Sequence, residues 1–500
     1  MEESPRTAPL AASEPPAASA RAVAAETVAP SGRAGRWLAL LRDRDHTRGA
    51  LVVSLVVLSL PAILQSLAGA GAYQIVDLYF LGQLGPVPTA AVGMTNQALR
   101  QVPFLLLLGG CIGAQMTVAR CVGAGRGEAA DHAAGQALLL GAALGALTAT
   151  GALVPRPLLA LVTSDPDAIA TAVPYLRLTF GLMFGHVFVM LFSFILTGAG
   201  ESTTPLLITL VSTPVAIFAE YCLIFGNFGA PALGVSGVAV GLACGTAVSL
   251  TLAIWALRSG RCRVHLRRRH LAPDPQVLRQ LLGVMWQPAL HMLARTVMLI
   301  YFMALAGHLG TKVQAAYTIG LRIELTLNML AFPIANACAT LVGQNLAAGS
   351  RRRAWRSIRV AYALEFSVLG SCAAFLLVFR HAIVDAFTRD PAVAAIAAEY
   401  LMFSAAAMCL HAFYFVSFRA LQGAGDMNSP MLISLTSALF LGAPLAYTLA
   451  TRTDLGPTGM WIAGLVYSLT NTALTVGWLA YGRWARAGRG QPPLPQRSAG

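Results

Sequence analysis

The sequence predicts an all-α polytopic membrane protein with twelve transmembrane helices in two six-helix lobes, related by a pseudo-two-fold axis along the membrane normal. Composition, the spacing of apolar runs and an internal repeat support this fold class. Of the 500 residues, 56% are hydrophobic and only 11% are charged, whereas soluble domains carry about 25% charged residues. The mean hydropathy is +0.66. Such a chain cannot hide its apolar surface in water, so the lipid bilayer is its predicted partner.

Twelve apolar runs are long enough to cross a bilayer, which takes about 20 mostly apolar residues. Proline lies inside several runs, and Pro61 is expected to kink the first helix. Packed membrane helices tolerate proline because neighbouring groups satisfy the freed carbonyls. The predicted spans are 51–80, 90–118, 133–160, 173–197, 205–226, 235–257, 281–306, 315–346, 358–385, 393–420, 430–450 and 458–481.

The 35 Lys and Arg residues divide unequally between the two sides of these spans. Five lie on one side: Arg156, Lys312, Arg380, Arg389 and Arg452. Nearly all the others, Arg419 among them, fall on the opposite side. Positive residues mark the cytoplasmic side, so both termini are predicted to be cytoplasmic in a multi-pass plasma-membrane protein. This distribution explains the net charge of +14 without a nucleic-acid partner.

The chain repeats itself with an offset of 225 residues. Residues 196–212 read LTGAGESTTPLLITLVS and residues 421–437 read LQGAGDMNSPMLISLTS, with nine of 17 positions identical. The same offset relates Gly234 to Gly459. Six spans is an even number, so both halves enter the membrane from the same side. Parallel repeats with a cavity between them, suited to alternating access, are therefore expected.

The predicted organisation has five parts. They are a disordered cytoplasmic tail at 1–48, an N-terminal lobe at 49–258, an Arg-rich cytoplasmic connector at 259–280, a C-terminal lobe at 281–482 and a cytoplasmic tail at 483–500.

The sequence carries no sign of an enzyme. Its eight cysteines form no CxxC pair, and neither a nucleophile–base pair nor acids with metal-ligand spacing occur, so no metal and no cofactor are expected. A GxxxxGK[ST] motif is also missing, which disfavours an ATP-driven pump.

Seven motifs together resemble those of the multidrug and toxic compound extrusion (MATE) family of cation-coupled exporters, over about residues 50–482. They are IVDLYFLGQLG (75–85), VGAGRGEA (122–129), GAGESTTP (198–205), EYCLIFGNFGAPALGVSG (220–237), LGTKVQAAYTIGLRIE (309–324), TLVGQNLAAG (340–349) and GAGDMNSP (423–430). The resemblance implies twelve helices in two lobes, and efflux of amphipathic, often cationic compounds driven by inward H⁺ or Na⁺. The glycines of these motifs are expected to supply tight turns and close helix approach.

Ionisable residues inside the spans are functional candidates, because burying a charge there costs ~2.5–3.5 kcal/mol even on the lenient insertion scale. Asp77 lies ~24 Å along the first helix from Pro61. In the family, the aspartate of the first-span VD…G pattern is the cation-coupling group, and Asp77 occupies that position. The alternative is a helix-end carboxylate that faces external water.

Glu220 is the second coupling candidate. DinF-like members tend to have an acid at this point of the fifth span, and an Asn one turn earlier helps to hold the site; here that position is Ala216. A glutamate paired with a nearby arginine is the alternative. The NorM-like branch carries an acid in span seven, but the stretch from Gln287 to Arg295 has none. The chain thus looks closer to the DinF-like branch, and H⁺ is favoured over Na⁺.

Other polar residues in the spans either line a cavity or pair between helices, and the sequence leaves both roles open. They are Glu324, Arg295, Arg322, Arg100, Gln65, Asn96 and Gln287. Arg295 could neutralise Glu324, or it could repel cationic substrates.

The favoured function is a secondary antiporter that exports amphipathic, drug-like or toxic organic compounds in exchange for an inward cation, working as a monomer. The alternative is a flippase for a lipid-linked precursor, which would expect a strongly cationic central cavity. Arg100, Arg295 and Arg322 keep that alternative open.

Overall fold

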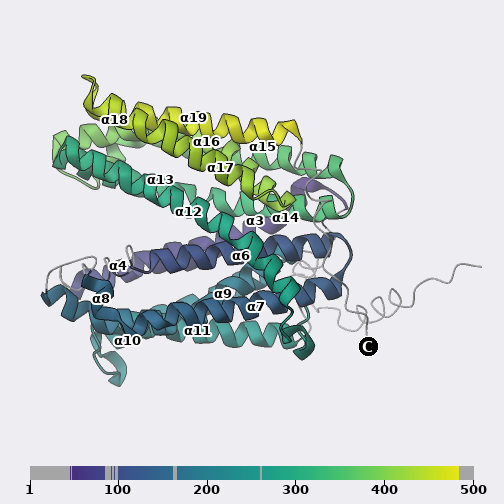
Figure 1. Ribbon diagram of the computed structural model, residues 1–500. Helices are drawn as coiled ribbons and strands as arrows, with labels where there is room; N and C mark the ends of the chain where they lie inside the picture. The colour runs from purple at the N-terminus through teal and green to yellow at the C-terminus, as the bar shows by residue number, and fades with distance from the viewer. Residues whose placement is uncertain are drawn as a thin grey trace, which may run out of the picture. The chain divides into compact units, whose positions relative to one another are not determined.

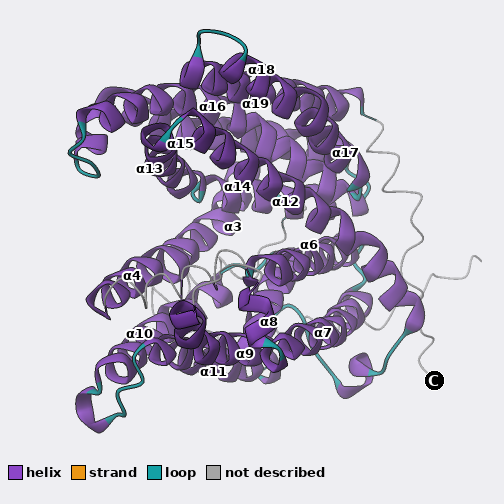
Figure 2. Cartoon of the chain, turned by 60° about the vertical axis from the view of Figure 1, so that its left-hand side comes forward, coloured by secondary structure: helices purple, strands orange, loops and turns teal. Residues whose placement is uncertain are grey.

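The computed structural model describes residue 46 and residues 48–84, 92, 95, 99–160, 166–259 and 262–482. Within this part of the chain, the regular elements are all helices (Figure 2). Twelve helical segments of the described residues are long and apolar enough to cross a membrane. The predicted all-α fold class is confirmed.

The first six crossings form the N-terminal lobe. Their helices are α3 (Leu51–Ser66), π-helix η1 (Leu67–Ala72), α4 (Tyr73–Leu84), α6 (Gln101–Gly123), α7 (Gly127–Ala149), η3 (Thr150–Leu153), α8 (Pro155–Ala160), α9 (Pro166–Ala199), α10 (Thr203–Phe225), η4 (Asn227–Gly229) and α11 (Val235–Arg258). The start of the predicted span 90–118 falls largely outside the described residues.

The last six crossings follow a short helix, η5 (Arg268–Leu271). Their helices are α12 (Pro275–Leu309), α13 (Thr311–Asn328), α14 (Ala331–Ala347), α15 (Arg351–Asp385), α16 (Pro391–Ala424), α17 (Asn428–Ser437), π-helix η6 (Ala438–Gly442), α18 (Ala443–Thr451) and α19 (Gly456–Tyr481).

Helix α12 packs into both lobes, and it runs from one to the other in Figure 1. Val277 and Leu281, near its beginning, belong to an apolar core formed with α6, α7 and α9. Met298 and Phe302, further along, belong to the core of the C-terminal lobe. The lobe predicted to begin at residue 281 therefore shares its first helix with the N-terminal lobe.

Small residues let the helices approach closely, as the glycine motifs predict. A Cβ on Gly123 would lie 2.2 Å from the carbonyl oxygen of Gln344, across the two lobes. Within the lobes, a Cβ on Gly198 would lie 2.4 Å from the carbonyl oxygen of Gln115, and one on Gly423 would lie 2.3 Å from that of Ala339. The Gly198 and Gly423 contacts are equivalent in the two repeats, so duplication preserved the packing as well as the sequence.

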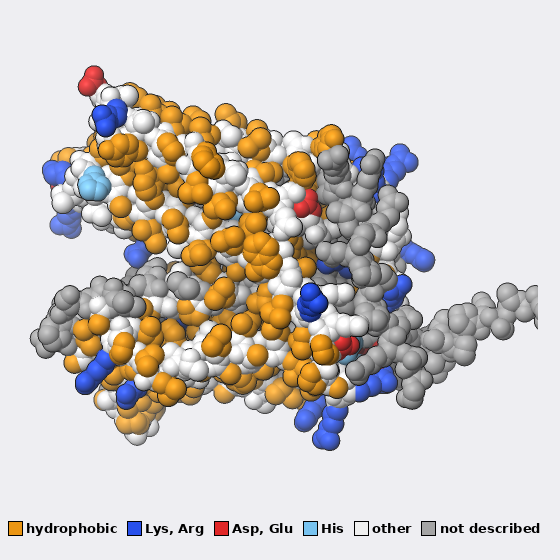
Figure 3. Space-filling view, viewed as in Figure 1, with side chains coloured by type: hydrophobic (Ala, Val, Ile, Leu, Met, Phe, Trp, Pro, Cys, Tyr) orange, Lys and Arg blue, Asp and Glu red, His pale blue; other side chains and the backbone are white. Residues whose placement is uncertain are grey.

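The surface agrees with a membrane-spanning fold. Hydrophobic side chains cover the middle of the visible face, and charged side chains gather at its two ends (Figure 3). The charges therefore avoid the band that the bilayer core would cover.

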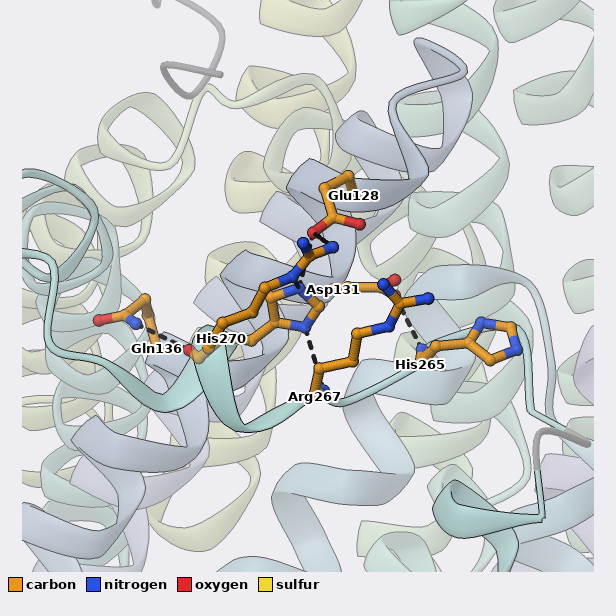
Figure 4. Close-up of polar contacts among 7 residues, drawn as sticks. Glu128, Asp131, Gln136, His265, Arg267 and His270 are labelled. Carbon is orange, nitrogen blue, oxygen red and sulfur yellow. Dashed lines mark hydrogen bonds and ion pairs between the residues drawn. The ribbon is translucent and has the colours of Figure 1, made fainter. Parts of the chain in front are cut away.

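The connector between the lobes is fixed to the start of α7 by polar contacts (Figure 4). Gln136 donates to the carbonyl oxygens of His270 (2.9 Å) and Ala272 (2.7 Å) and accepts from the backbone N–H of Asp274 (2.9 Å). Asp131 accepts from the backbone N–H of His265 at 2.8 Å. We call this end of the molecule the connector end.

Asp274 ends the connector and caps α12. It accepts from the backbone N–H groups of Gln276 and Val277 and contacts His132 Nε2 at 3.2 Å. Burial acts to raise the pKa of Asp274, but the hydrogen bonds from His132 and the backbone outweigh it and hold that pKa below its ordinary value. A carboxyl group with a lowered pKa stabilises the folded state above its unfolded-state pKa, ~3.9 for aspartate, and loses this contribution as pH falls through the folded-state value.

We therefore expect Asp274→Ala to lower the midpoint of thermal unfolding at pH 7, with a loss of about 1 kcal/mol from the missing cap. The difference from the parent should shrink below pH ~4. Thermal scans of purified protein at both pH values measure it, with the exposed Asp454→Ala as control. An equal loss at both pH values would contradict the assignment.

Candidate functional site

The two acids singled out in the N-terminal lobe lie beside each other. Asp77 comes from α4 and Glu220 from α10, and the two carboxyl groups and the phenol of Tyr73 are near enough to act on one another electrostatically. Glu220 is 0% exposed. Gly241 on α11 makes this burial possible, because a Cβ there would lie 2.6 Å from the Cα of Glu220.

Both Glu220 oxygens, Oδ1 of Asp77 and the Tyr73 hydroxyl lack a hydrogen-bond partner among the described residues. The surroundings are apolar, with Phe80, Tyr175 and Ile224 in the neighbouring core cluster. Two adjacent carboxylates, Glu220 fully buried and Asp77 half-buried, repel each other, and the apolar surroundings make that repulsion costly. Binding a proton or a cation would relieve it.

The first crossing departs from α-helical geometry at a π-helix and not at Pro61. The α-helix α3 continues through Pro61 as far as Ser66. The departure comes at the π-helix η1, with the sequence LAGAGA, directly before the helix that carries Asp77. Such π segments often mark functional sites.

The remaining N-lobe candidates are spread out. Arg100 lies ahead of α6, acts electrostatically on Asp77, and lines a small pocket together with Thr179 and His186. Gln65 Nε2 on α3 donates to the Ser193 hydroxyl at 3.4 Å. Asn96 lies outside the described residues.

The C-terminal lobe contains a partly open cavity of about 160 Å³. Glu324 on α13 lines it, and Oε2 of this carboxylate accepts from the hydroxyls of Tyr400 (2.6 Å) and Ser404 (2.8 Å) on α16. These described contacts are with two neutral hydroxyls rather than with an arginine.

Aromatic rings surround the Glu324 end of the cavity. The ring centroids of Tyr317 and Tyr400 are 5.4 Å apart, and those of Tyr400 and Trp461 are 4.9 Å apart. Rings in this arrangement bind flat apolar groups and cations through their faces.

Arg295 on α12 lies over the ring of Phe415, with 5.7 Å from its Cζ to the centroid, and lines the same cavity. Near it, the Tyr414 hydroxyl is hydrogen-bonded to His291 Nε2 (2.9 Å) and to the Ser434 hydroxyl (3.0 Å).

The two other C-lobe candidates lie outside this cavity lining. Arg322 is exposed on α13. Gln287 is buried on α12 and donates to the Gly283 carbonyl of its own helix at 2.8 Å.

Arg419 is a buried arginine that connects the two lobes, and its position differs from the predicted one. Arg419 was counted among the loop charges of the predicted cytoplasmic side, but it lies within α16 and is 1% exposed. It donates to Gln422 (2.6 Å), to Asn336, and across the lobes to Oε1 of Gln115 (3.2 Å). No ion pair of Arg419 occurs among the described residues.

Gln115 also donates to the Thr340 hydroxyl at 3.1 Å. These two residues are 225 positions apart, and because Gly198 packs on Gln115 and Gly423 on Ala339, Thr340 lies one residue beyond the repeat equivalent of Gln115. Residues at equivalent places, or next to them, can contact each other only near the axis that relates the lobes. The Gln115–Thr340–Arg419 contacts therefore mark the pseudo-two-fold axis.

Sequence reasoning missed the aromatic residues and the Arg419 contacts. Single Tyr and Trp residues at helical spacing look like ordinary core positions, so nothing marked Tyr317, Tyr400 and Trp461. The 225-residue offset could have indicated the Gln115–Thr340 contact, but the two residue types differ.

Two repeated lobes that hold buried carboxyl groups in one half and a cavity in the other define a membrane transporter rather than an enzyme. The chain belongs to the multidrug and toxic compound extrusion family. The family model described as MatE matches residues 61–222 and again residues 288–448, once in each half, which confirms both the predicted family and the internal repeat.

Named relatives cover most of the chain. The probable multidrug resistance protein NorM of Thermotoga maritima is 26% identical over 437 residues, 86% of this chain and 93% of that protein. Multidrug resistance protein PmpM of Pseudomonas aeruginosa is 28% identical over 434 residues, 84% of this chain and 89% of that protein. A solved structure described as the outward-facing conformation of a MATE family transporter superposes with a TM-score of 0.81 at 22% identity, covering 91% of this chain and 99% of that one, and shows the same fold.

We expect Gln115→Leu to destabilise the protein. It removes the donor to Thr340 and one acceptor of the buried Arg419, and each buried group left unsatisfied costs about 1–3 kcal/mol. Adding Arg419→Met should recover part of the loss, because the buried charge is then gone. Thermal unfolding of both single variants and the double variant measures this coupling, and strictly additive losses would contradict it.

Proposed function

We propose that this transporter is a proton-coupled antiporter that exports amphipathic organic compounds by alternating access between its two lobes. The observation that carries the proposal is the Asp77–Glu220 pair, two adjacent carboxyl groups whose oxygens largely lack described partners. The cavity of the C-terminal lobe is the proposed substrate site.

Protons are favoured over Na⁺ for two reasons. A hard metal cation takes several oxygen ligands, whereas Ala216 stands where a polar partner would help to hold it. The positive Arg100 also acts on Asp77 and would repel a second cation. A proton needs only one carboxylate oxygen.

Substrates of the amphipathic class fit the cavity because its aromatic walls offer flat apolar contact, while Glu324 offers a charge. The relatives' names, multidrug resistance proteins, support the same class. The flippase alternative is weaker: of Arg100, Arg295 and Arg322, only Arg295 lines the cavity, and a pyrophosphate group would need more positive charge.

Several finer assignments belong to the same proposal. We place both termini in the cytoplasm of a monomeric plasma-membrane protein, because the positive residues concentrate on that side. The five-part division at 1–48, 49–258, 259–280, 281–482 and 483–500 follows from the same spans. The DinF-like branch is favoured by Glu220 and by the acid-free stretch from Gln287 to Arg295.

Replacing Asp77 with Asn should abolish efflux while the protein still reaches the membrane, because the amide cannot take up a proton. Drug-susceptibility assays of cells that express each form, normalised to membrane protein, measure this effect. Asp454→Asn, at an exposed turn, is the control. Full resistance in the Asp77 variant would remove the coupling assignment.

Transport in proteoliposomes should stop when the pH gradient is collapsed and should continue when Na⁺ is replaced by choline. The physical reason is that only the proton gradient then drives the Asp77–Glu220 pair between its two states. The opposite pattern would overturn the choice of ion and leave the carboxyl pair as a Na⁺ site.

A further inference from the structure

We propose that the cavity of the C-terminal lobe selects zwitterionic amphipathic compounds, with a cationic group held at its Glu324 end and a carboxylate held at Arg295. This inference rests on the proposed function, because it names the substrate class of the same cavity. It follows from two opposite charges that line one space without pairing.

The negative end has the chemistry of a cation site. Both described hydrogen bonds to Glu324 are made to Oε2, so Oε1 keeps its capacity to accept. Tyr317, Tyr400 and Trp461 lie around this carboxylate, and the buried Trp461 Nε1 has no described partner. A carboxylate beside aromatic faces attracts an organic cation by charge and by cation–π contact.

The positive end has the chemistry of an anion site. The guanidinium of Arg295 lies over the face of Phe415, and none of the ion pairs among the described residues includes it. Its polar neighbours in the cavity, His291 and Tyr414, are already joined to each other. A guanidinium can bind a carboxylate through two parallel hydrogen bonds.

The two charges contact different levels of α16. Glu324 accepts a hydrogen bond from Ser404, and Arg295 lies over the ring of Phe415. At 1.5 Å per residue, these levels are about 16 Å apart along the helix. His411 lies between these levels on the helix and lines the same cavity.

A ligand with a single charge can pair with only one of the two charged residues, Glu324 or Arg295. A purely cationic compound gains at Glu324 but meets the field of Arg295, and Coulomb interactions are strong where water is excluded. A zwitterion satisfies both ends and also relieves the unpaired guanidinium. The cavity therefore discriminates by the carboxylate of the compound as well as by its cation.

Two dyes that differ by one methyl ester test this selection. Rhodamine 110 carries a cationic ring system and a free carboxylate, whereas rhodamine 123 is its methyl ester and carries the cation alone. Binding to the purified full chain in lipid nanodiscs is followed by fluorescence polarisation at pH 7. We expect rhodamine 110 to bind at least about tenfold more tightly.

Variants assign the two ends of the cavity. Arg295→Gln should remove the preference by weakening rhodamine 110 alone, and Arg295→Lys should keep much of it. Glu324→Gln should weaken both dyes. Arg322→Gln is the matched control, because this arginine is two residues from Glu324 on the same helix but is exposed and outside the cavity lining.

Equal affinity for the two dyes, or an unchanged preference in Arg295→Gln, would overturn the inference. Transport of both dyes in proteoliposomes separates it from the proposed function. If both dyes are exported but bind equally, charge selection fails and the antiporter stands. If the binding preference holds but neither dye moves across the membrane, charge selection stands and the export proposal fails.

Discussion

Close approach of helix backbones around the pseudo-two-fold axis is the constraint on which the rest of the molecule depends. At the connector end, Gly123 leaves room for the backbone of Gln344, and Gln115 donates a hydrogen bond to Thr340 of the other lobe. A larger side chain at Gly123 would separate the lobes. The buried Arg419 adds polar contacts that direct this packing, because an unsatisfied guanidinium is costly. Small residues therefore allow the lobes to pack closely, and hydrogen bonds between polar side chains fix how the lobes are positioned against each other.

The ionisable pair and the cavity lie in different lobes, and this separation decides how they can be coupled. Asp77 and Glu220 belong to α4 and α10, whereas the cavity is lined from α12, α13, α16 and α19. Under the proposed assignment, a proton and an organic compound do not compete for the same atoms. Each can influence the other only by favouring one arrangement of the lobes. Helix α12 packs into both cores, and α3, which leads into the helix that carries Asp77, packs Leu55 and Leu58 against residues of the C-terminal lobe, so both helices connect the lobes.

The fold could be predicted from the sequence because the patterns that indicate it are local or periodic along the chain. The apolar runs predicted the twelve crossings, and the 225-residue repeat predicted the two lobes. The glycine motifs predicted close packing, which Gly123, Gly198 and Gly423 confirm. Intramembrane charge pointed to Asp77 and Glu220 one by one, but their contact depends on how α4 packs near α10, and spacing along the chain does not encode that. Arg419 was wrongly assigned to a loop for a related reason. It lies near the end of a predicted span, where arginines commonly belong to loops, and only the tertiary packing shows that it is buried.

The central claim is that proton and substrate favour opposite arrangements of the lobes through Asp77 and Glu220. The most direct measurement is proton release on substrate binding, followed with a pH indicator in weakly buffered solutions of purified protein. Adding rhodamine 110 should release protons into solution, and the release should vanish in a variant that carries both Asp77→Asn and Glu220→Gln. Binding without proton release in the parent protein, or undiminished release in that variant, would contradict the claim.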